Sequence, residues 1–219
     1  MADPTPPATY RRDADSLEFD RLATFCDAIF AIAMTLLTLG IGVPVLAAPD
    51  DAAELADQLQ DRWPEIFSFA LSFLVIGFYW VAHHRFVALL AAVDRTAVTL
   101  ALPYLLLIAF LPYPTSLIGR YEANATAFVV YAVNVAAISA MEWVMLRHAH
   151  RRGHLRRPLS REGYRWATIA SLMPSVFFLA SVPVAFVSTQ AAVLVWLANV
   201  PVQAVGDRLR PAAVRAELR

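Results

Sequence analysis

The chain contains no lysine and only one cysteine, Cys26, among its 219 residues. A single cysteine excludes an internal disulfide and a Cys-x-x-Cys metal or redox site. Charged residues make up only 16% of the chain, and 18 basic side chains balance 18 acidic ones, which disfavours a nucleic-acid-binding protein. Low charge combined with a high apolar content also excludes a disordered chain.

Apolar residues are abundant instead. They make up 59% of the chain and the mean hydropathy is +0.54, whereas soluble domains are roughly 45–50% apolar. A transmembrane helix needs about 20 mainly apolar residues. Six segments approach this length: 22–45, 66–83, 96–111, 125–146, 166–187 and 191–206. The sequence therefore predicts an all-α polytopic membrane protein with six transmembrane helices in a single domain.

The arginines predict how these helices are oriented. With six spans and both termini on one side, every arginine except Arg62 and Arg120 falls on that side. Basic residues accumulate on the cytoplasmic side of membrane proteins, so we expect both termini to be cytoplasmic. We expect a disordered, proline-containing cytoplasmic tail over 1–15, a six-helix transmembrane domain over 16–207 and a cytoplasmic C-terminal tail over 208–219.

The first apolar segment has two different faces. At 100° per residue, Leu36 and Leu39 each lie within about 40° of Ile32, so the three share a stripe about 60° wide, and Thr35 borders it. Asp27 lies about 140° from Ile32 on the same wheel, so we expect it to face the helices of its own chain. An ionisable residue inside a span is a functional hypothesis by default because burying charge there is costly. We expect Asp27 to pair with His83, His84 or an arginine rather than to coordinate an ion.

Three short motifs occur in order along the first half of the chain. The first is Arg-x-x-x-Phe-Cys-Asp, formed by Arg21, Phe25, Cys26 and Asp27. The second is Trp-x-x-His at the end of the second span, and the third is Leu-Pro-Tyr-Pro-Thr over 111–115. Together they resemble the TMEM175 family of potassium channels in its prokaryotic six-span form. Cys26 stands where that family has serine, and a thiol is a weaker hydrogen-bond donor than a hydroxyl.

This resemblance implies a homotetrameric, potassium-selective leak channel in a prokaryotic cell membrane, with the first helix of each subunit lining a central pore. The narrowest part of the pore would be formed by Ile32, Thr35, Leu36 and Leu39. The motif residues Arg21, Phe25, Cys26 and Asp27 would form the framework that holds the pore helix, supported by Trp80, His83 and His84.

The partners implied are potassium ions, membrane lipids and further copies of the chain, with no cofactor and no bound metal other than the permeant ion. His83 and His84 are adjacent and point to different faces, so they make a poor metal pair. We expect one of them to form a hydrogen bond with the motif region instead. Trp80 can also be a packing or interface aromatic.

Two alternatives remain open. The first is a proton-coupled secondary transporter in which Asp27 and a histidine form a proton relay. The second is a membrane-embedded enzyme, which has the least support because no span carries paired carboxylates, a metal-ligand cluster or a nucleophile with its base. Potassium flux down its gradient, without coupling to protons, distinguishes the channel from the transporter.

Overall fold

The computed structural model describes residues 9–13 and 16–218, and almost all of its regular structure is helical. The chain order is β1 (Thr9–Arg11), α1 (Ser16–Leu36), the 3-10 turn η1 (Leu37–Gly40), α2 (Ala52–Asp61), α3 (Trp63–Leu89), β2 (Ala92–Asp94), α4 (Arg95–Phe110), α5 (Pro112–Arg120), α6 (Ala125–Arg152), α7 (Arg161–Ala185), α8 (Thr189–Leu209) and α9 (Ala212–Glu217). Within the described residues, six helical stretches are long and apolar enough to cross a membrane. This confirms the prediction of an all-α fold with six spans.

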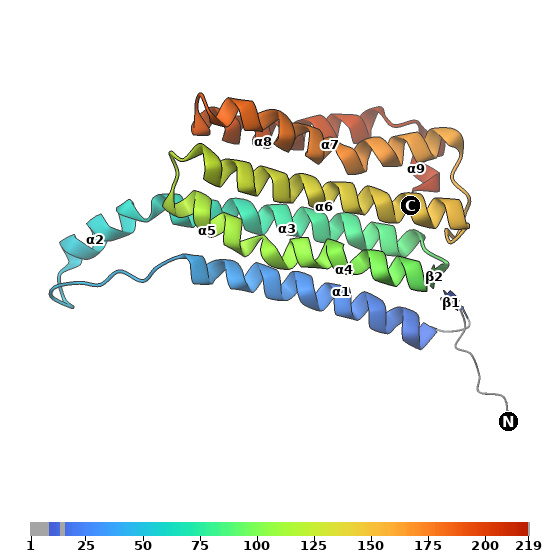
Figure 1. The fold of residues 1–219 in the computed structure, drawn as a ribbon, viewed down its shortest axis with the longest axis horizontal. Coiled ribbons are helices and arrows are strands. Elements are labelled where there is room, and N and C mark those ends of the chain that lie inside the picture. The colour runs from blue at the N-terminus through green and yellow to red at the C-terminus, as the bar shows by residue number, and fades with distance from the viewer. Residues whose placement is uncertain (1–8, 14–15, 219) are drawn as a thin grey trace.

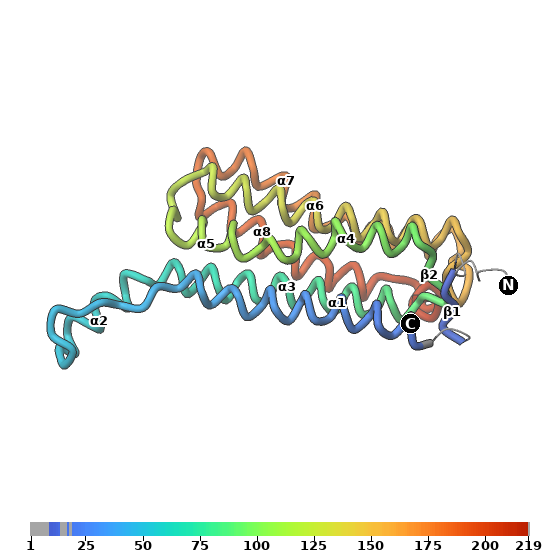
Figure 2. The backbone as a smooth tube through the Cα atoms, turned by 60° about the horizontal axis from the view of Figure 1, so that its bottom comes forward, coloured from blue at the N-terminus to red at the C-terminus, as the bar shows by residue number. Residues whose placement is uncertain are grey.

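The long helices lie side by side along one axis, with α1 at one edge of the bundle and α7 and α8 at the opposite edge (Figure 1). Helix α6 packs against both α7 and α4 and is the most buried of the six spans. Helix α1 packs against α3 and α4. Figure 2 shows α2 projecting beyond the bundle at one end, while β1 and β2 lie at the other end. The bundle core is therefore centred on α6, and α1 covers one of its margins.

Polar side chains begin most of these helices. Asp51, Asp94, Asn124, Ser160 and Ser188 each accept a hydrogen bond from a backbone N–H in the first turn of the helix that follows. Such caps satisfy N–H groups that have no partner within the helix. Because these side chains are local to each helix, the helix starts follow from the sequence directly.

Most predicted span ends differ from the helix ends in the structure by a few residues, and in the first and third spans the regular α-helix is also interrupted. The first helix was expected to reach residue 45 but ends at Gly40, after its last turn tightens into η1. The third span was expected to end at residue 111 but continues through α5 to Arg120. Leu111 keeps a helical backbone, and Pro112 occupies the first position of α5, where its missing N–H would be unpaired in any case. The proline therefore interrupts the helix without ending the span.

The predicted terminal tails also need correction. Residues 1–8 and 14–15 of the expected disordered tail lie outside the described residues, but Thr9–Arg11 forms β1 and pairs antiparallel with β2. At the other end, α8 extends to Leu209 and α9 follows it, with Val214 buried. Glu217 of α9 accepts hydrogen bonds from the backbone and the hydroxyl of Ser160. The pairing of β1 with β2 and the contact between Glu217 and Ser160 give regular structure to two segments whose composition suggested tails.

Buried hydroxyls connect the helices within the bundle. The hydroxyl of Tyr131 on α6 lies 3.0 Å from Ser72 Oγ on α3, and Thr115 Oγ1 on α5 lies 2.8 Å from the same oxygen. On α8, Trp196 donates to Ser181 of α7 at 2.6 Å. Hydrogen bonds of this kind join membrane helices because lipid offers no alternative partner. Thr115, the last residue of the third motif, thus holds α5 against α3.

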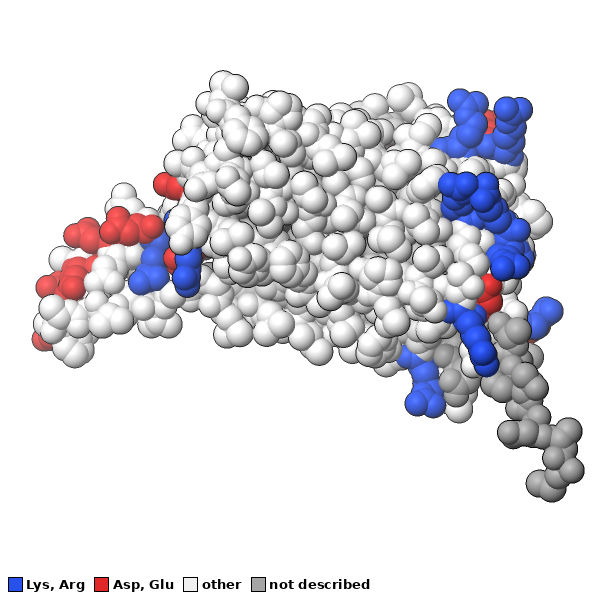
Figure 3. Space-filling model, viewed as in Figure 1, with Lys and Arg blue, Asp and Glu red and all other residues white. Residues whose placement is uncertain are grey.

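Charged side chains gather at the two ends of the bundle. On the face shown in Figure 3, arginines crowd the end that carries β1 and β2, acidic residues cluster around α2 at the other end, and the wide middle is almost free of charge. A band without charge between two charged ends is the surface expected of helices that cross the hydrocarbon core of a bilayer.

Candidate functional site

The aliphatic stripe predicted on the first span lies on an open face of α1 and of the η1 turn that continues it. Ile32 is 53% exposed, Leu36 42% and Leu39 77%. Phe30 and Ala33, on the opposite face, are each only 1% exposed and pack inside the bundle. One side of α1 is therefore buried in its own chain, and the other presents an uncharged aliphatic surface that the described residues leave largely open.

Thr35 adds a polar oxygen to this surface. Its side chain is exposed, and its hydroxyl donates to the backbone carbonyl of Ile32 at 2.8 Å. A hydroxyl has one donor hydrogen and two acceptor lone pairs. Because the donor is used within the helix, the lone pairs remain available to a cation or to water.

The first motif joins the open face of α1 to the bundle. Asp27 Oδ1 accepts a hydrogen bond of 2.9 Å from Trp80 Nε1 on α3, so Asp27 faces the second span of its own chain. We expected His83, His84 or an arginine as its partner, and the structure shows Trp80 instead. Tryptophan can reach a carboxylate in the adjacent helix because its indole N–H lies at the edge of a large ring.

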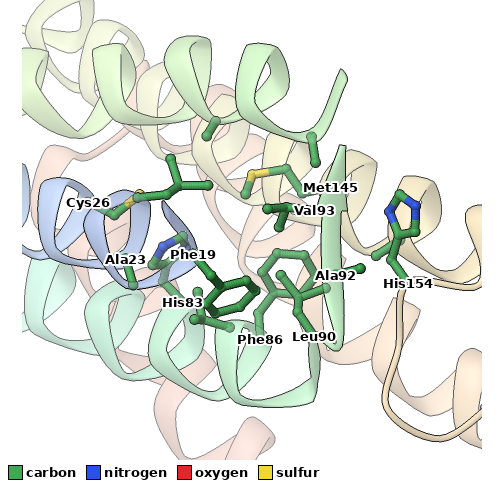
Figure 4. A pocket seen from close by; sticks show the side chains of 15 residues that line it. Phe19, Ala23, Cys26, His83, Phe86, Leu90, Ala92, Val93, Met145 and His154 are labelled. Carbon is green, nitrogen blue, oxygen red and sulfur yellow. The ribbon is translucent and has the colours of Figure 1, made fainter. Parts of the chain in front are cut away.

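The other motif residues divide between the inside and the outside of the bundle. Cys26 is 2% exposed and faces inward, whereas Phe25 is 50% exposed and Arg21 is also exposed. Figure 4 shows Cys26 close to His83 at one end of a cavity lined mainly by apolar side chains, among them Phe19 and Phe86. The thiol that replaces the family's serine is thus a buried packing group next to α3.

The two adjacent histidines of α3 point in different directions, as expected from their spacing. His83 is buried and stacks on Tyr104, with ring centroids 5.4 Å apart and an interplanar angle of 20°. Its Nε2 has no hydrogen-bond partner among the described residues. His84 is exposed, and its ring centroid lies 5.8 Å from that of Trp80. Within the described residues, His83 therefore supports the motif region through ring contacts, and Trp80 forms the hydrogen bond.

The structure also brings together three residues that the sequence reasoning missed. Asp94 precedes α4, His148 lies near the end of α6, and His154 follows that helix; one ligand-type atom from each lies within 4.8 Å of the other two. Asp94 comes from a segment more than 50 residues before the histidines. The only local signal was a pair of histidines six residues apart in a basic segment, which does not by itself predict a site.

The environment shifts two pKa values in this cluster. Partial burial favours a higher pKa for the Asp94 carboxyl, but the N–H of Ala97 and the hydrogen bond and charge of His148 outweigh it, so the pKa lies below its usual value. Burial lowers the pKa of His154, and the nearby Asp94 carboxylate only partly offsets this effect. Both shifts favour a charged Asp94 and a neutral His154.

Comparisons with known proteins agree with this architecture. The model of the family described as the endosomal/lysosomal potassium channel TMEM175 matches residues 21–112, which include the stripe and the first motif. A protein of Streptomyces collinus named as a potassium channel is 35% identical over 176 residues, covering 78% of this chain and 84% of the relative. The human endosomal/lysosomal proton channel TMEM175 is 28% identical over 162 residues, which cover 71% of this chain but only 31% of the human protein.

A solved structure extends the similarity to the fold. The crystal structure of a lysosomal potassium-selective channel TMEM175 homolog from Chamaesiphon minutus aligns with a TM-score of 0.73 and 29% sequence identity. The match covers 86% of this chain and 97% of that one. The similarity thus includes nearly all of the six-span bundle as well as the motif region. The chain is a multi-pass membrane protein that belongs to the TMEM175 family.

Proposed function

We propose that this protein is a potassium-selective, leak-type cation channel in which four copies of α1 surround a central pore. The observation that carries the proposal is the open aliphatic face of α1 and η1, with Ile32, Leu36 and Leu39 exposed on one side while the other side is packed. A helix that lines a shared pore needs one face for its own bundle and one face for the axis. The bacterial relatives named as potassium channels support the same function.

In this arrangement the three aliphatic positions form stacked hydrophobic rings. A narrow hydrophobic ring excludes water, and a small widening lets water and a partly hydrated cation pass. The lone pairs of Thr35 lie beside these rings and offer an oxygen ligand in place of lost water. The constriction therefore discriminates by width and by the cost of removing water, since Ile32, Thr35, Leu36 and Leu39 carry no charge.

The charged ends support an orientation in which both termini are cytoplasmic. The end with β1, β2 and most of the arginines faces the cytoplasm, and the acidic α2 lies outside. With this orientation, Asp27 lies near the cytoplasmic mouth of α1. Its hydrogen bond to Trp80 makes it a part of the framework that positions the pore helix. The alternative proton relay requires a histidine partner, and Asp27 accepts its hydrogen bond from Trp80 instead.

Potassium and sodium fluxes from liposomes test the proposal. Purified protein should release potassium down its gradient faster than sodium, without coupling to protons. Absence of potassium flux, or uptake strictly coupled to protons, would overturn the channel assignment.

Substitution of the stripe tests the constriction separately. Alanine at position 32, 36 or 39 should raise the flux or relax ion selection, because each removes part of the hydrophobic barrier. Leu194→Ala is the matched control, since Leu194 is 66% exposed on α8, at the edge of the bundle opposite α1. Unchanged flux in all three variants would remove the stripe from the pore even if the wild-type protein conducts.

Water accessibility tests the same point by another route. In a Cys26→Ser background, Leu36→Cys should react with a charged thiol reagent added from the aqueous phase, whereas Leu194→Cys should not. The reverse result would place the stripe against lipid.

A further inference from the structure

A cluster of three side chains lies outside the proposed pore, at the arginine-rich end of the bundle. His148 Nε2 is 2.9 Å from Asp94 Oδ1 and 3.1 Å from Asp94 Oδ2. The ring of His154 meets that of His148 edge to face, with centroids 5.8 Å apart. Two imidazoles and a carboxylate from separate segments thus converge on one point.

His154 provides a second, independent observation. The residue as a whole is only 9% exposed, and its Nδ1 is buried without a hydrogen-bond partner among the described residues. Buried polar atoms in proteins are nearly always paired, so an unpartnered nitrogen beside two potential ligands needs an explanation. Figure 4 shows this imidazole at the far end of the apolar cavity, well separated from His83.

The backbone around His154 holds the cluster in place. Gly153 adopts the left-handed conformation with φ of 69°, which ends α6 and reverses the chain. The N–H of His154 then donates to the Ala149 carbonyl at 2.9 Å, and its carbonyl accepts from the N–H of Ala91 at 2.8 Å. His154 is therefore fixed to the end of α6 and to the segment that leads into Asp94.

Asp94 is also anchored and keeps one oxygen for a ligand. Its Oδ1 accepts the N–H of Ala97 at 2.7 Å and so begins α4. Its Oδ2 lies 3.1 Å from His148 Nε2 and 4.0 Å from Arg152 Nε. The Arg152 side chain is 63% exposed and can turn into solvent. A cation at Oδ2 would therefore compete with a mobile surface charge rather than with a buried one.

We propose that Asp94, His148 and His154 form a binding site for a divalent transition-metal ion of the zinc type. Two imidazole nitrogens and one carboxylate oxygen, with the fourth position left to water, is a common zinc donor set. Calcium and magnesium prefer sites made of oxygen atoms, so the two histidines disfavour them.

The distances suit this ion after a small adjustment. Tetrahedral zinc with ligands at about 2.0–2.1 Å places the ligand atoms about 3.3 Å apart. His148 and Asp94 already meet this separation, and the His154 ring has to approach by no more than about 1.5 Å, within reach of a side-chain rotation. Bound metal would join the start of α4 to the end of α6.

Metal titration of the full-length, tag-free protein in detergent tests the site. After treatment with a chelator, the protein should bind one Zn²⁺ per chain, and Co²⁺ should produce the visible absorption of a tetrahedral site. His148→Gln and His154→Gln should each weaken Zn²⁺ binding by more than about tenfold, because even the partners of metal ligands contribute ten- to a hundredfold.

His150→Gln is the matched control. His150 lies in the same last turns of α6 but stacks on Tyr164 at a centroid distance of 4.3 Å, so its replacement should leave binding unchanged. Arg152→Gln removes the positive charge that competes for Asp94, so it should tighten Zn²⁺ binding several-fold. This variant keeps all three proposed ligands, so it tests the site even where a histidine variant folds poorly. Absence of stoichiometric binding, equal affinity in the His154→Gln protein, or weaker binding in the Arg152→Gln protein would overturn the proposal.

Discussion

The hydrogen bond between Trp80 and Asp27 leads to a quantitative prediction about the pore-helix framework. Trp80→Phe keeps an aromatic ring against α1 but removes the N–H that donates to Asp27 over 2.9 Å. Hydrogen bonds to charged groups contribute about 1.5–3 kcal/mol when they are well buried. Trp80 is 39% exposed and Asp27 is also exposed, so water competes for both groups.

The contribution of the Trp80–Asp27 hydrogen bond is therefore expected at the lower end of this range. Hydrogen bonds between membrane helices average about 0.6 kcal/mol and reach about 1.7 kcal/mol. We expect a coupling energy of about 1 kcal/mol between the two side chains, which corresponds to a fall of about 2–4 °C in the unfolding midpoint for a chain of this size.

A double-mutant cycle in detergent measures this coupling directly. The proteins compared are the wild type, Trp80→Phe, Asp27→Ala and the double variant, with the unfolding midpoint as the readout. Trp63→Phe is the control, because Trp63 is 64% exposed on the same helix and its side chain forms no hydrogen bond within the described residues. Independent mutations add to within about 0.3–0.5 kcal/mol, so a coupling energy below about 0.3 kcal/mol would refute the reasoning.

A further variant, Asp27→Asn, separates a framework role from an ion-binding role. If Asp27 positions α1, Asp27→Asn should alter assembly or the size of the flux more than the ratio of potassium to sodium flux. A change in that ratio alone would mean that Asp27 contacts the permeant ion.

Two further predictions concern the arginine-rich end. Gly153→Ala should destabilise the protein by about 1–2 kcal/mol, because a side chain is strained at a φ of 69°. A lower unfolding midpoint, with the potassium flux kept, is the expected result. Unchanged stability would contradict the left-handed conformation of Gly153. In the presence of a chelator, the unfolding midpoint should fall as the pH drops below 6.5, because the folded state lowers the pKa of His154 and the unfolded chain then binds a proton that the folded chain does not. His154→Gln should flatten this pH dependence. The lowered pKa of Asp94 also destabilises the fold as the pH falls, but only below its usual value of 3.8. An equal slope in the wild-type and His154→Gln proteins would contradict the lowered pKa of His154.

Much of the fold could be predicted because its signals are local. Six apolar runs predict six spans, since the thickness of the bilayer sets a minimum length that can be counted along the chain. The ends of the spans are less clearly marked in the sequence than their number. Pro112 predicts the end of a helix, but as the first residue of α5 it does not prevent the span from continuing beyond α4.

The shared side of the aliphatic stripe was also predictable, whereas its exposure was implied only by the family resemblance. Ile32, Leu36 and Leu39 share one side of any α-helix, because residues three and four apart are neighbours whatever surrounds them. The same arithmetic placed Asp27 on the opposite side, toward its own chain. It could not name the partner, and Trp80 was overlooked in favour of the adjacent histidines and the arginines.

The sequence alone determined the number of spans, the family motifs and the two faces of the first helix, because each depends on composition or on the helical period. Only the tertiary structure decided that Trp80 meets Asp27 across a separation of 53 residues and that Asp94 lies beside His148 and His154. These contacts depend on how far each helix is rotated and shifted against its neighbour. Side-chain packing over the whole bundle sets that arrangement, and no short stretch of the chain encodes it.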